Sequence, residues 1–328
     1  MMDRFVTTGS GPSAEEWRRL LPLMREVNDL KRVRAPGIGP SVAAEWFRRA
    51  ATRLFHDGTG GSEGEWELLA RRVTADALIA TRLGAIGADD LRAGGLGRDA
   101  VERVFGRALE ERREALDAGL HDALAASLDH PPVPPASSPV DDLAGDGLGS
   151  WIDRLVAQPR AGATAPGQPR IVLEPVESCA EHCLVTAVYA VMLAPSFGAE
   201  PEAAFAIGMA HHLHNARLPD AGFAGEALIG DALGTLIATL RRAVLSSMDP
   251  AAAERIAPWL EEIDTVDTPL ALAFHTADTI DRVLQMEYFA RCNRFTLETA
   301  LVDMELVHAG PVQAFQLAQL ANAGLVTA

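Results

Sequence analysis

The chain of 328 residues carries a formal net charge of −16, and 48% of its residues are hydrophobic while only 5% are aromatic. A chain this acidic lacks the clustered Lys and Arg that nucleic acid polymers require, so we exclude them as partners. The apolar content predicts a substantial core, and the abundance of Ala and Leu favours helix over strand.

The cysteines and the first residues indicate the compartment. Three cysteines are too few, and odd in number, for a disulfide framework, which is typical of a reducing environment. The opening MMDRFVTTGSGPSAEEW has no apolar leader, and no run of about twenty apolar residues occurs. We therefore expect a cytoplasmic protein without a membrane partner. Cys179 and Cys183 are expected to be core side chains.

The first 130 residues have the apolar spacing of helices. Ser13 and Glu16 have the spacing of a capping box, with which a helix to about residue 29 should begin. Further helices are expected over 41–54 and 65–83. A single long amphipathic helix is expected over 98–128.

A proline-rich segment, HPPVPPASSPVDDLAGDGLG, separates this region from the rest of the chain. Proline cannot continue a helix, so we predict a linker over 131–169 that contains one short helix near Trp151. Beyond it only the short RIVLEP could form a strand. The fold class is therefore expected to be all-α, with an N-terminal helical region (1–130) and a second helical domain (170–328). Helices of that domain are expected over 178–194, 200–214, 224–247, 250–263, 267–291, 296–308 and 311–325.

Three of the nine histidines fall within four residues of MAHHLHNARLPDAGF, namely His211, His212 and His214. Adjacent residues of a helix point about 100° apart, so His211 and His212 can both face one point only near a helix end. Pro219 supplies such an end. Separate helices can each direct an imidazole or a carboxylate toward one metal ion.

Three segments together resemble the motifs of the HD-domain metal-dependent phosphohydrolases, nearest to their 5′-deoxynucleotidase-like branch. These are ESCAEHCLVTAVYA, GMAHHLHNARLPD and HTADTIDRVLQMEY, and the likeness covers about residues 170–292. The resemblance implies an HD-type helical bundle. It also implies roles for individual residues: metal ligands at His182, His211 and Asp278, a carboxylate beside the substrate at Asp220, and a phosphate contact at Arg170.

Two departures from the family pattern affect the expected chemistry. The HD dipeptide reads His211-His212 here, and the family's catalytic Glu falls on Asn215, which cannot exchange a proton at neutral pH. A ligand set that includes His212 favours a divalent transition metal (Fe, Co, Ni, Mn or Zn) over Mg. Asp220 or His214 is then the candidate general base.

Several nearby residues have competing interpretations. Asp281 competes with Asp278 as the last ligand, since both lie on one helix face. His275 is expected to serve helix packing, and His308 to be structural or exposed.

The expected function is a metal-dependent phosphohydrolase acting on a nucleotide or another small phosphorylated metabolite. One alternative is a degenerate HD bundle that binds a ligand or partner without hydrolysis. Another is an iron-dependent HD-type oxygenase, with His214 and His275 as extra ligands. Homo-oligomer formation is left open.

Overall fold

The computed structural model describes residues 11–36, 39–56, 64–133, 150–171, 173–293 and 296–326. Within these ranges the protein is built from fourteen α-helices, and no strand is present, which confirms the all-α prediction. Two isolated antiparallel bridges occur, Pro159 with Ser178 and Ala163 with Ile171. The second uses one residue of RIVLEP, which forms no strand among the described residues.

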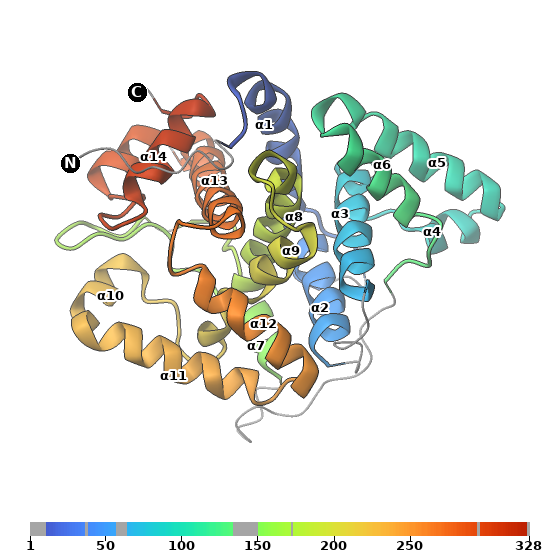
Figure 1. Ribbon diagram of the computed structural model, residues 1–328. Helices are drawn as coiled ribbons and strands as arrows, with labels where there is room; N and C mark the ends of the chain where they lie inside the picture. Colours follow the sequence, from blue (N-terminus) through green and yellow to red (C-terminus); the bar gives the residue numbers. More distant parts are fainter. Residues whose placement is uncertain are drawn as a thin grey trace.

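Most helices follow one another with short connections, but longer stretches of chain separate α6 from α7 and α7 from α8 (Figure 1). The N-terminal region contains α1 (Ala14–Asn28), η1 (Asp29–Lys31), α2 (Val42–Phe55), α3 (Glu65–Leu83), α4 (Ala88–Ala93), α5 (Arg98–Glu110), η2 (Arg113–Ala115) and α6 (Ala118–Ser127). The remainder contains α7 (Trp151–Ala157), α8 (Cys179–Phe197), α9 (Pro201–Ala210), η3 (Leu213–Ala216), α10 (Gly222–Ile229), η4 (Gly230–Ala232), α11 (Leu233–Leu245), α12 (Pro250–Glu262), α13 (Pro269–Asn293), the π-helical turn η5 (Thr299–Asp303) and α14 (Gln313–Asn322).

Helices α8 and α9 form the centre of the molecule, with α2 and α3 on one side and α13 on the other (Figure 1). Almost every residue of α8 is buried, as expected for a helix that is apolar on all sides. The two central helices touch at Gly208, where an added Cβ would lie 2.3 Å from the Ala187 Cα. This contact fixes the spacing of the two helices that carry the histidine motifs.

One hydrophobic core joins the two sides of the proline-rich segment. Trp17, Phe47 and Trp66 of the N-terminal helices belong to the same buried cluster as Tyr189 and Phe205. Residues 134–149, which include three of the eight prolines of the predicted linker, lie outside the described residues. The division of the chain into domains stays a prediction.

Two predicted helices are each divided in the structure. The expected helix 98–128 is wrong, because Leu116 is extended and the Asp117 carboxylate accepts a hydrogen bond from the Leu120 N–H, which starts α6. The expected helix 224–247 divides at Gly230, whose φ of 60° is left-handed. The helix expected over 296–308 is shorter in the structure, where the helical residues end with the turn η5 at Asp303.

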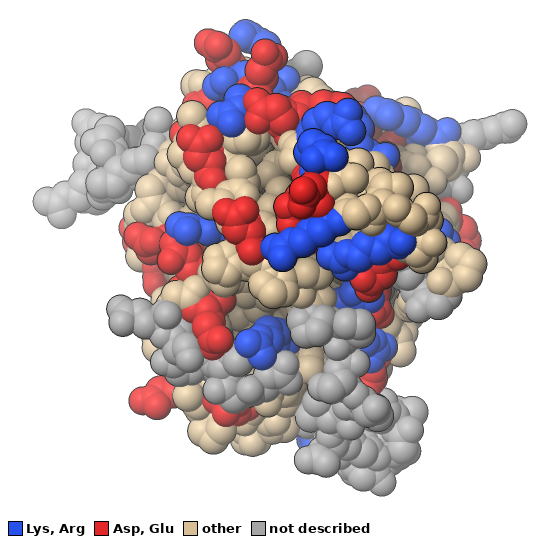
Figure 2. All heavy atoms as spheres, turned by 90° about the vertical axis from the view of Figure 1, so that its right-hand side faces the viewer, with Lys and Arg blue, Asp and Glu red and all other residues tan. Residues whose placement is uncertain are grey.

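The surface beside α4, α5 and α6 is a mixture of charges. Figure 2, which looks onto the right-hand side of Figure 1, shows acidic and basic side chains interspersed there. Exposed ion pairs such as Arg98 with Glu102 and Arg113 with Glu110 account for part of this pattern. A solvated helix face has this character.

The contact at Gly208 gives a first prediction. Gly208→Ala should lower the free energy of unfolding by roughly 1–3 kcal/mol or more, because the new methyl group collides with backbone atoms of α8. Gly106→Ala is the matched control, since Gly106 lies in α5 with nothing within 4 Å, and it should stabilise by up to about 1 kcal/mol. Urea unfolding measures both. Equal effects would contradict the proposed close contact.

Candidate metal centre

Three side chains from three helices converge on one point. His182 lies in the first turn of α8, which begins with a capping box of Ser178 and Glu181. His211 is the C-cap of α9, and Asp278 belongs to α13. We refer to His182, His211 and Asp278 as the donor cluster.

The imidazoles of the donor cluster are turned so that their Nε2 atoms face each other. The two Nε2 atoms are 3.1 Å apart, and the Asp278 Oδ1 lies 3.2 Å from that of His182 and 4.0 Å from that of His211. The other nitrogens have partners: His182 Nδ1 is 2.7 Å from the Asp281 Oδ2, and His211 Nδ1 donates to the Gly208 carbonyl at 2.8 Å. The Nε2 atoms are therefore the ring nitrogens that face the point where a cation would bind.

The spacing of these atoms fits a transition metal ion. A triangle with sides of 3.1, 3.2 and 4.0 Å has a centre about 2 Å from each corner, close to the usual length of metal–imidazole and metal–carboxylate bonds. Two imidazoles and one carboxylate are also donors that such metals accept. The residues therefore fit a metal ion on geometry and on chemistry.

A second set of charges holds His182 in place. Asp281, on the Nδ1 side of the ring, accepts hydrogen bonds from the Lys31 ammonium at 2.6 and 2.8 Å and from the Asn28 amide at 2.9 Å. Lys31 also contacts Glu177 at 2.5 Å. Glu177, His182 and Asp281 are close enough together to bind a second metal ion. The Lys31 ammonium, however, already pairs with both of these carboxylates. Asp281 thus orients a ligand, and Asp278 faces the donor point.

The pKa shifts at the donor cluster follow from burial and charge. Burial and the nearby His182 lower the pKa of His211 to about 3, so this imidazole is neutral at neutral pH. Burial opposes ionisation of Asp278, but Arg282 and the hydrogen bond with His182 outweigh it and hold the pKa well below its usual range. Burial and Arg160 act to lower the pKa of His182. The hydrogen bonds with Asp278 and Asp281 have the larger effect, so the net pKa of His182 is raised.

His212 lies beside the donor cluster but is bonded elsewhere. Its Nε2 is 2.8 Å from an Arg160 guanidinium nitrogen, and its Nδ1 is 2.7 Å from the Asn215 Oδ1. Burial and Arg160 lower the pKa of His212 well below its usual value. One ring nitrogen from each of His182, His211 and His212 lies within 4.8 Å of the other two. His212 can therefore become a fourth ligand only if Arg160 moves away.

Asp220 is close to the site and serves as an anchor. Its two oxygens accept hydrogen bonds from the Ala161 and Gly222 N–H groups at 3.1 and 2.9 Å, and Arg160 lies 3.5 Å away. Burial raises the pKa of Asp220, but Arg160 and these two N–H groups outweigh it, and the net pKa is lowered. A carboxylate held in this way is a weak proton acceptor.

The donor cluster opens into a cavity of about 230 Å³. Its wall includes Arg160, Arg282 and His308, and the His308 ring stacks on Phe223 with centroids 4.0 Å apart. Sequence reasoning missed Arg160 and did not foresee a site position for His308. The sequence offered one indication of Arg160, namely that a basic residue precedes the first His motif. Arg170 also precedes that motif, so this indication did not distinguish the two arginines.

The structure does not bring every predicted residue to this cavity. Arg170 is exposed and is not part of the wall. His214 is likewise not part of it, and its ring lies 5.7 Å from that of His212. His275 Nε2 bonds to the Ile263 carbonyl at 2.8 Å, which agrees with the helix-packing role expected for it.

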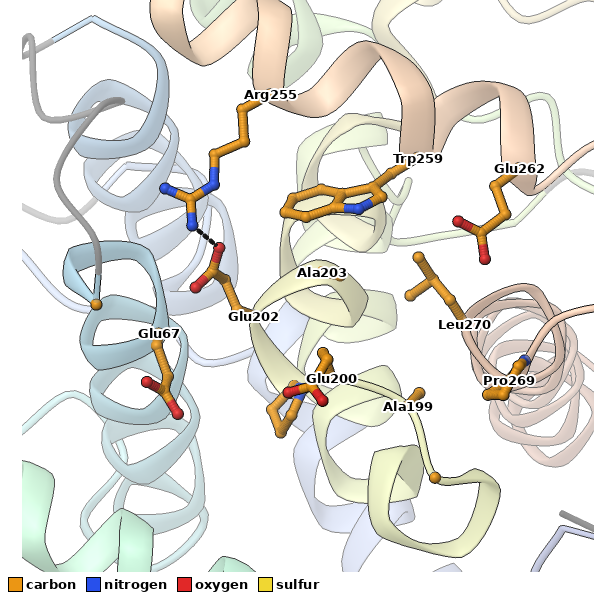
Figure 3. Close-up of a pocket in the computed structure, with 13 residues that line it drawn as sticks. Glu67, Ala199, Glu200, Glu202, Ala203, Arg255, Trp259, Glu262, Pro269 and Leu270 are labelled. Atoms are coloured by element: carbon orange, nitrogen blue, oxygen red, sulfur yellow. Dashed lines mark hydrogen bonds and ion pairs between the residues drawn. The ribbon is translucent and has the colours of Figure 1, made fainter.

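A larger cavity of about 730 Å³ lies elsewhere, beside the start of α9 (Figure 3). Four glutamates line it, together with Trp259 and with Arg255, which is paired with Glu202. None of the described residues in its wall is a histidine, and its acidic lining is unsuited to a phosphate. The smaller cavity is therefore the candidate site.

Comparison with known proteins adds nothing to this geometry. No family model matches the chain, and neither a curated protein nor a solved structure is similar to it. The HD-domain resemblance thus rests on the sequence motifs, and the site rests on the positions of its own atoms.

The buried ammonium of Lys31 gives a second prediction. Lys31→Met should lower the free energy of unfolding by roughly 3–5 kcal/mol, because it leaves the buried Asp281 and Glu177 carboxylates without their cation. Arg98→Met removes one partner of an exposed ion pair and should leave stability nearly unchanged. Thermal unfolding of both variants tests this. A small effect at Lys31 would show that the ion-pair network does not hold the fold.

Proposed function

We propose that the protein is a metal-dependent phosphohydrolase that acts on a nucleotide or another small phosphate monoester. The observation that carries the proposal is the donor cluster, in which two imidazole Nε2 atoms and one carboxylate oxygen surround a point about 2 Å from each. When bound there, a divalent transition metal supplies an acidified water and neutralises phosphate charge. The order of the HD-type sequence motifs supports the same class.

The cavity has the charge expected for a phosphate site. Arg160 and Arg282 both line it, and the side chain of each is no more than 20% exposed. Arginine binds phosphate oxygens through paired N–H groups, which orients the phosphate. The cavity of about 230 Å³ is smaller than most ligand sites, so it suits a phosphate group with a small part of its ester.

Asn215 and Asp220, two of the positions from which a general base was expected, are both engaged in other hydrogen bonds. The Asn215 amide accepts from His212 and donates to the Leu218 carbonyl at 2.9 Å. Both oxygens of Asp220 already accept backbone N–H groups. We therefore expect slow turnover, since the Glu that usually takes the proton in the family falls on Asn215.

A non-hydrolytic binding protein is the second candidate, and one observation favours it. Arg160 bridges His212 and Asp220, so a cation of the chain itself occupies the half of the site where a fourth ligand would act. Such a site can hold a metal and an anion without turning the anion over. The oxygenase alternative has weaker support, because His275 is bonded to the Ile263 carbonyl.

The metal content tests the donor cluster. Protein purified without chelator should contain close to one transition metal ion per chain by elemental analysis. His211→Ala and Asp278→Ala should each lose it, because each removes one of three donors. His275→Ala, in the same helix as Asp278, should keep the metal. Full occupancy in the first two variants would exclude this site.

Phosphate release separates the enzyme from the binding protein. Metal-loaded protein should release phosphate from a nucleoside monophosphate or a sugar phosphate, and Asp278→Asn should abolish the release. Asn215→Glu should be no less active, because it supplies the missing base beside His212. A wild-type protein that binds metal yet is inert across a broad panel of phosphate esters with Mn, Fe, Co, Ni and Zn would favour the binding protein.

A further inference from the structure

One carboxylate in the wall of the candidate cavity has no partner in the described part of the protein. Four of the described residues that line this cavity are acidic, and Glu226 of α10 is one of them. The other three are each paired with a basic side chain: Glu177 with Lys31, Asp220 with Arg160 and Asp278 with Arg282. Glu226 forms no hydrogen bond or ion pair with any residue that the structure describes. A half-buried carboxylate in this position is left to be neutralised by what enters the cavity.

The position of Glu226 is set by the first turn of α10. The Ala224 N–H donates a hydrogen bond to the Thr164 hydroxyl oxygen at 3.1 Å. Gly222, whose φ of 65° is left-handed, lies so close to this hydroxyl that an added Cβ would be 2.4 Å from its oxygen. Helix α10 is therefore fastened to the loop that precedes α8. Phe223 and Glu226 are three residues apart on α10, so they share a helix face, and both line the cavity.

The surroundings of Glu226 favour a cation beside it. Burial and the charge of Asp220 raise the pKa of Glu226. Arg160 and Arg282 oppose this shift but do not reverse it. The ionised carboxylate is thus destabilised where it stands, and a cation beside it would stabilise it. The aromatic ring of Phe223 in the same wall also attracts a cationic group.

A phosphate ester without a cation would match this wall poorly. The phosphate of a monoester carries close to two negative charges at neutral pH, and Arg160 and Arg282 are the basic side chains that would bind it. Glu226 would then share a cavity of about 230 Å³ with these charges and would lose the two arginines as opposing cations. An ammonium group on the alcohol part of the ester would neutralise Glu226. The small volume admits only a short chain between the two groups.

We propose that the preferred ligand of the cavity is the phosphate monoester of a small amino alcohol, whose ammonium group is bound by Glu226. This inference rests on the proposed function for the phosphate end of the cavity, and it narrows the substrate class. It also applies to a protein that binds the ester without hydrolysis, because recognition of the ammonium group does not require turnover.

Two pairs of matched esters test the proposal. Aminoethyl phosphate and propyl phosphate have nearly the same shape, and the first carries an ammonium group where the second carries a methyl group. Aminopropyl phosphate and butyl phosphate form a longer pair of the same kind. Isothermal titration calorimetry on the full chain as purified should show that the amino ester of at least one pair binds about ten-fold or more tightly than its neutral partner.

Variants of Glu226 show whether this carboxylate causes the preference. Glu226→Gln should bring the ratio of the two dissociation constants close to one, through weaker binding of the amino ester, and Glu226→Asp should keep part of the preference. Asp231→Asn is the matched control, because Asp231 is an exposed carboxylate just after α10 that does not line the cavity, and it should keep the whole preference. Thermal unfolding checks that each variant is folded.

The outcomes separate this inference from the proposed hydrolase. Equal affinities within both pairs, or a preference that survives Glu226→Gln, would overturn the inference. Preferential binding of an amino ester without release of phosphate would support the inference and count against the hydrolase. Release of phosphate from both esters of each pair with equal kcat/KM would support the hydrolase and overturn the inference. Binding of none of the four esters would count against both.

Discussion

The buried carboxylate of Asp281 is the interaction on which the site depends. It accepts hydrogen bonds from Lys31 and Asn28 and contacts the Nδ1 of His182, and it is fully buried. A buried carboxylate is costly unless such partners surround it, so the end of α1, the turn η1, α8 and α13 must come together. The same contact sets the ring of His182, because an Nδ1–H donated to Asp281 leaves Nε2 free to face the donor point. The N-terminal region is therefore part of the support of the candidate metal centre, although no member of the donor cluster comes from it.

Packing and chemistry meet again at Gly208. The absence of a side chain there lets α9 touch α8 at Ala187, and the Gly208 carbonyl accepts the Nδ1–H of His211. Because α9 ends at His211, this imidazole belongs to a helix end, where the backbone can turn it toward α8. His182 and His211 thus lie on two helices in contact. The Asp281 carboxylate of α13 orients His182, and the Gly208 carbonyl of α9 orients His211. Sites supported by rigid helices in this way hold their donors more accurately than sites carried by loops.

Local signals explain which parts of this structure were predictable. The capping box at Ser13 and the helical spacing of residues 65–83 depend on neighbours in sequence, and both predictions were confirmed. The divided helices were also readable in principle, because Asp117 is a strong N-cap residue and Gly230 accepts a left-handed turn. Lys31 was not readable, since it meets Asp281 across 250 residues. Arg160 was not either, because its position follows from the bridge between Pro159 and Ser178, which brings this loop to the start of α8. The motif order indicated the donor cluster, but nothing local indicated the charges around it.

Arg160 connects the two functional interpretations. Its guanidinium contacts the Nε2 of His212 and lies 3.5 Å from Asp220, and all three residues line the cavity. A phosphate dianion that enters the cavity competes with Asp220 for this guanidinium, and it carries more charge than one carboxylate. If Arg160 turns to the phosphate, the Nε2 lone pair of His212 is released beside the donor cluster. The fourth ligand and the substrate are then linked, since the anion that needs the metal also frees a nitrogen to bind it. If Arg160 holds both partners instead, the site keeps three donors and an internal cation, which is the arrangement of a binding site without turnover.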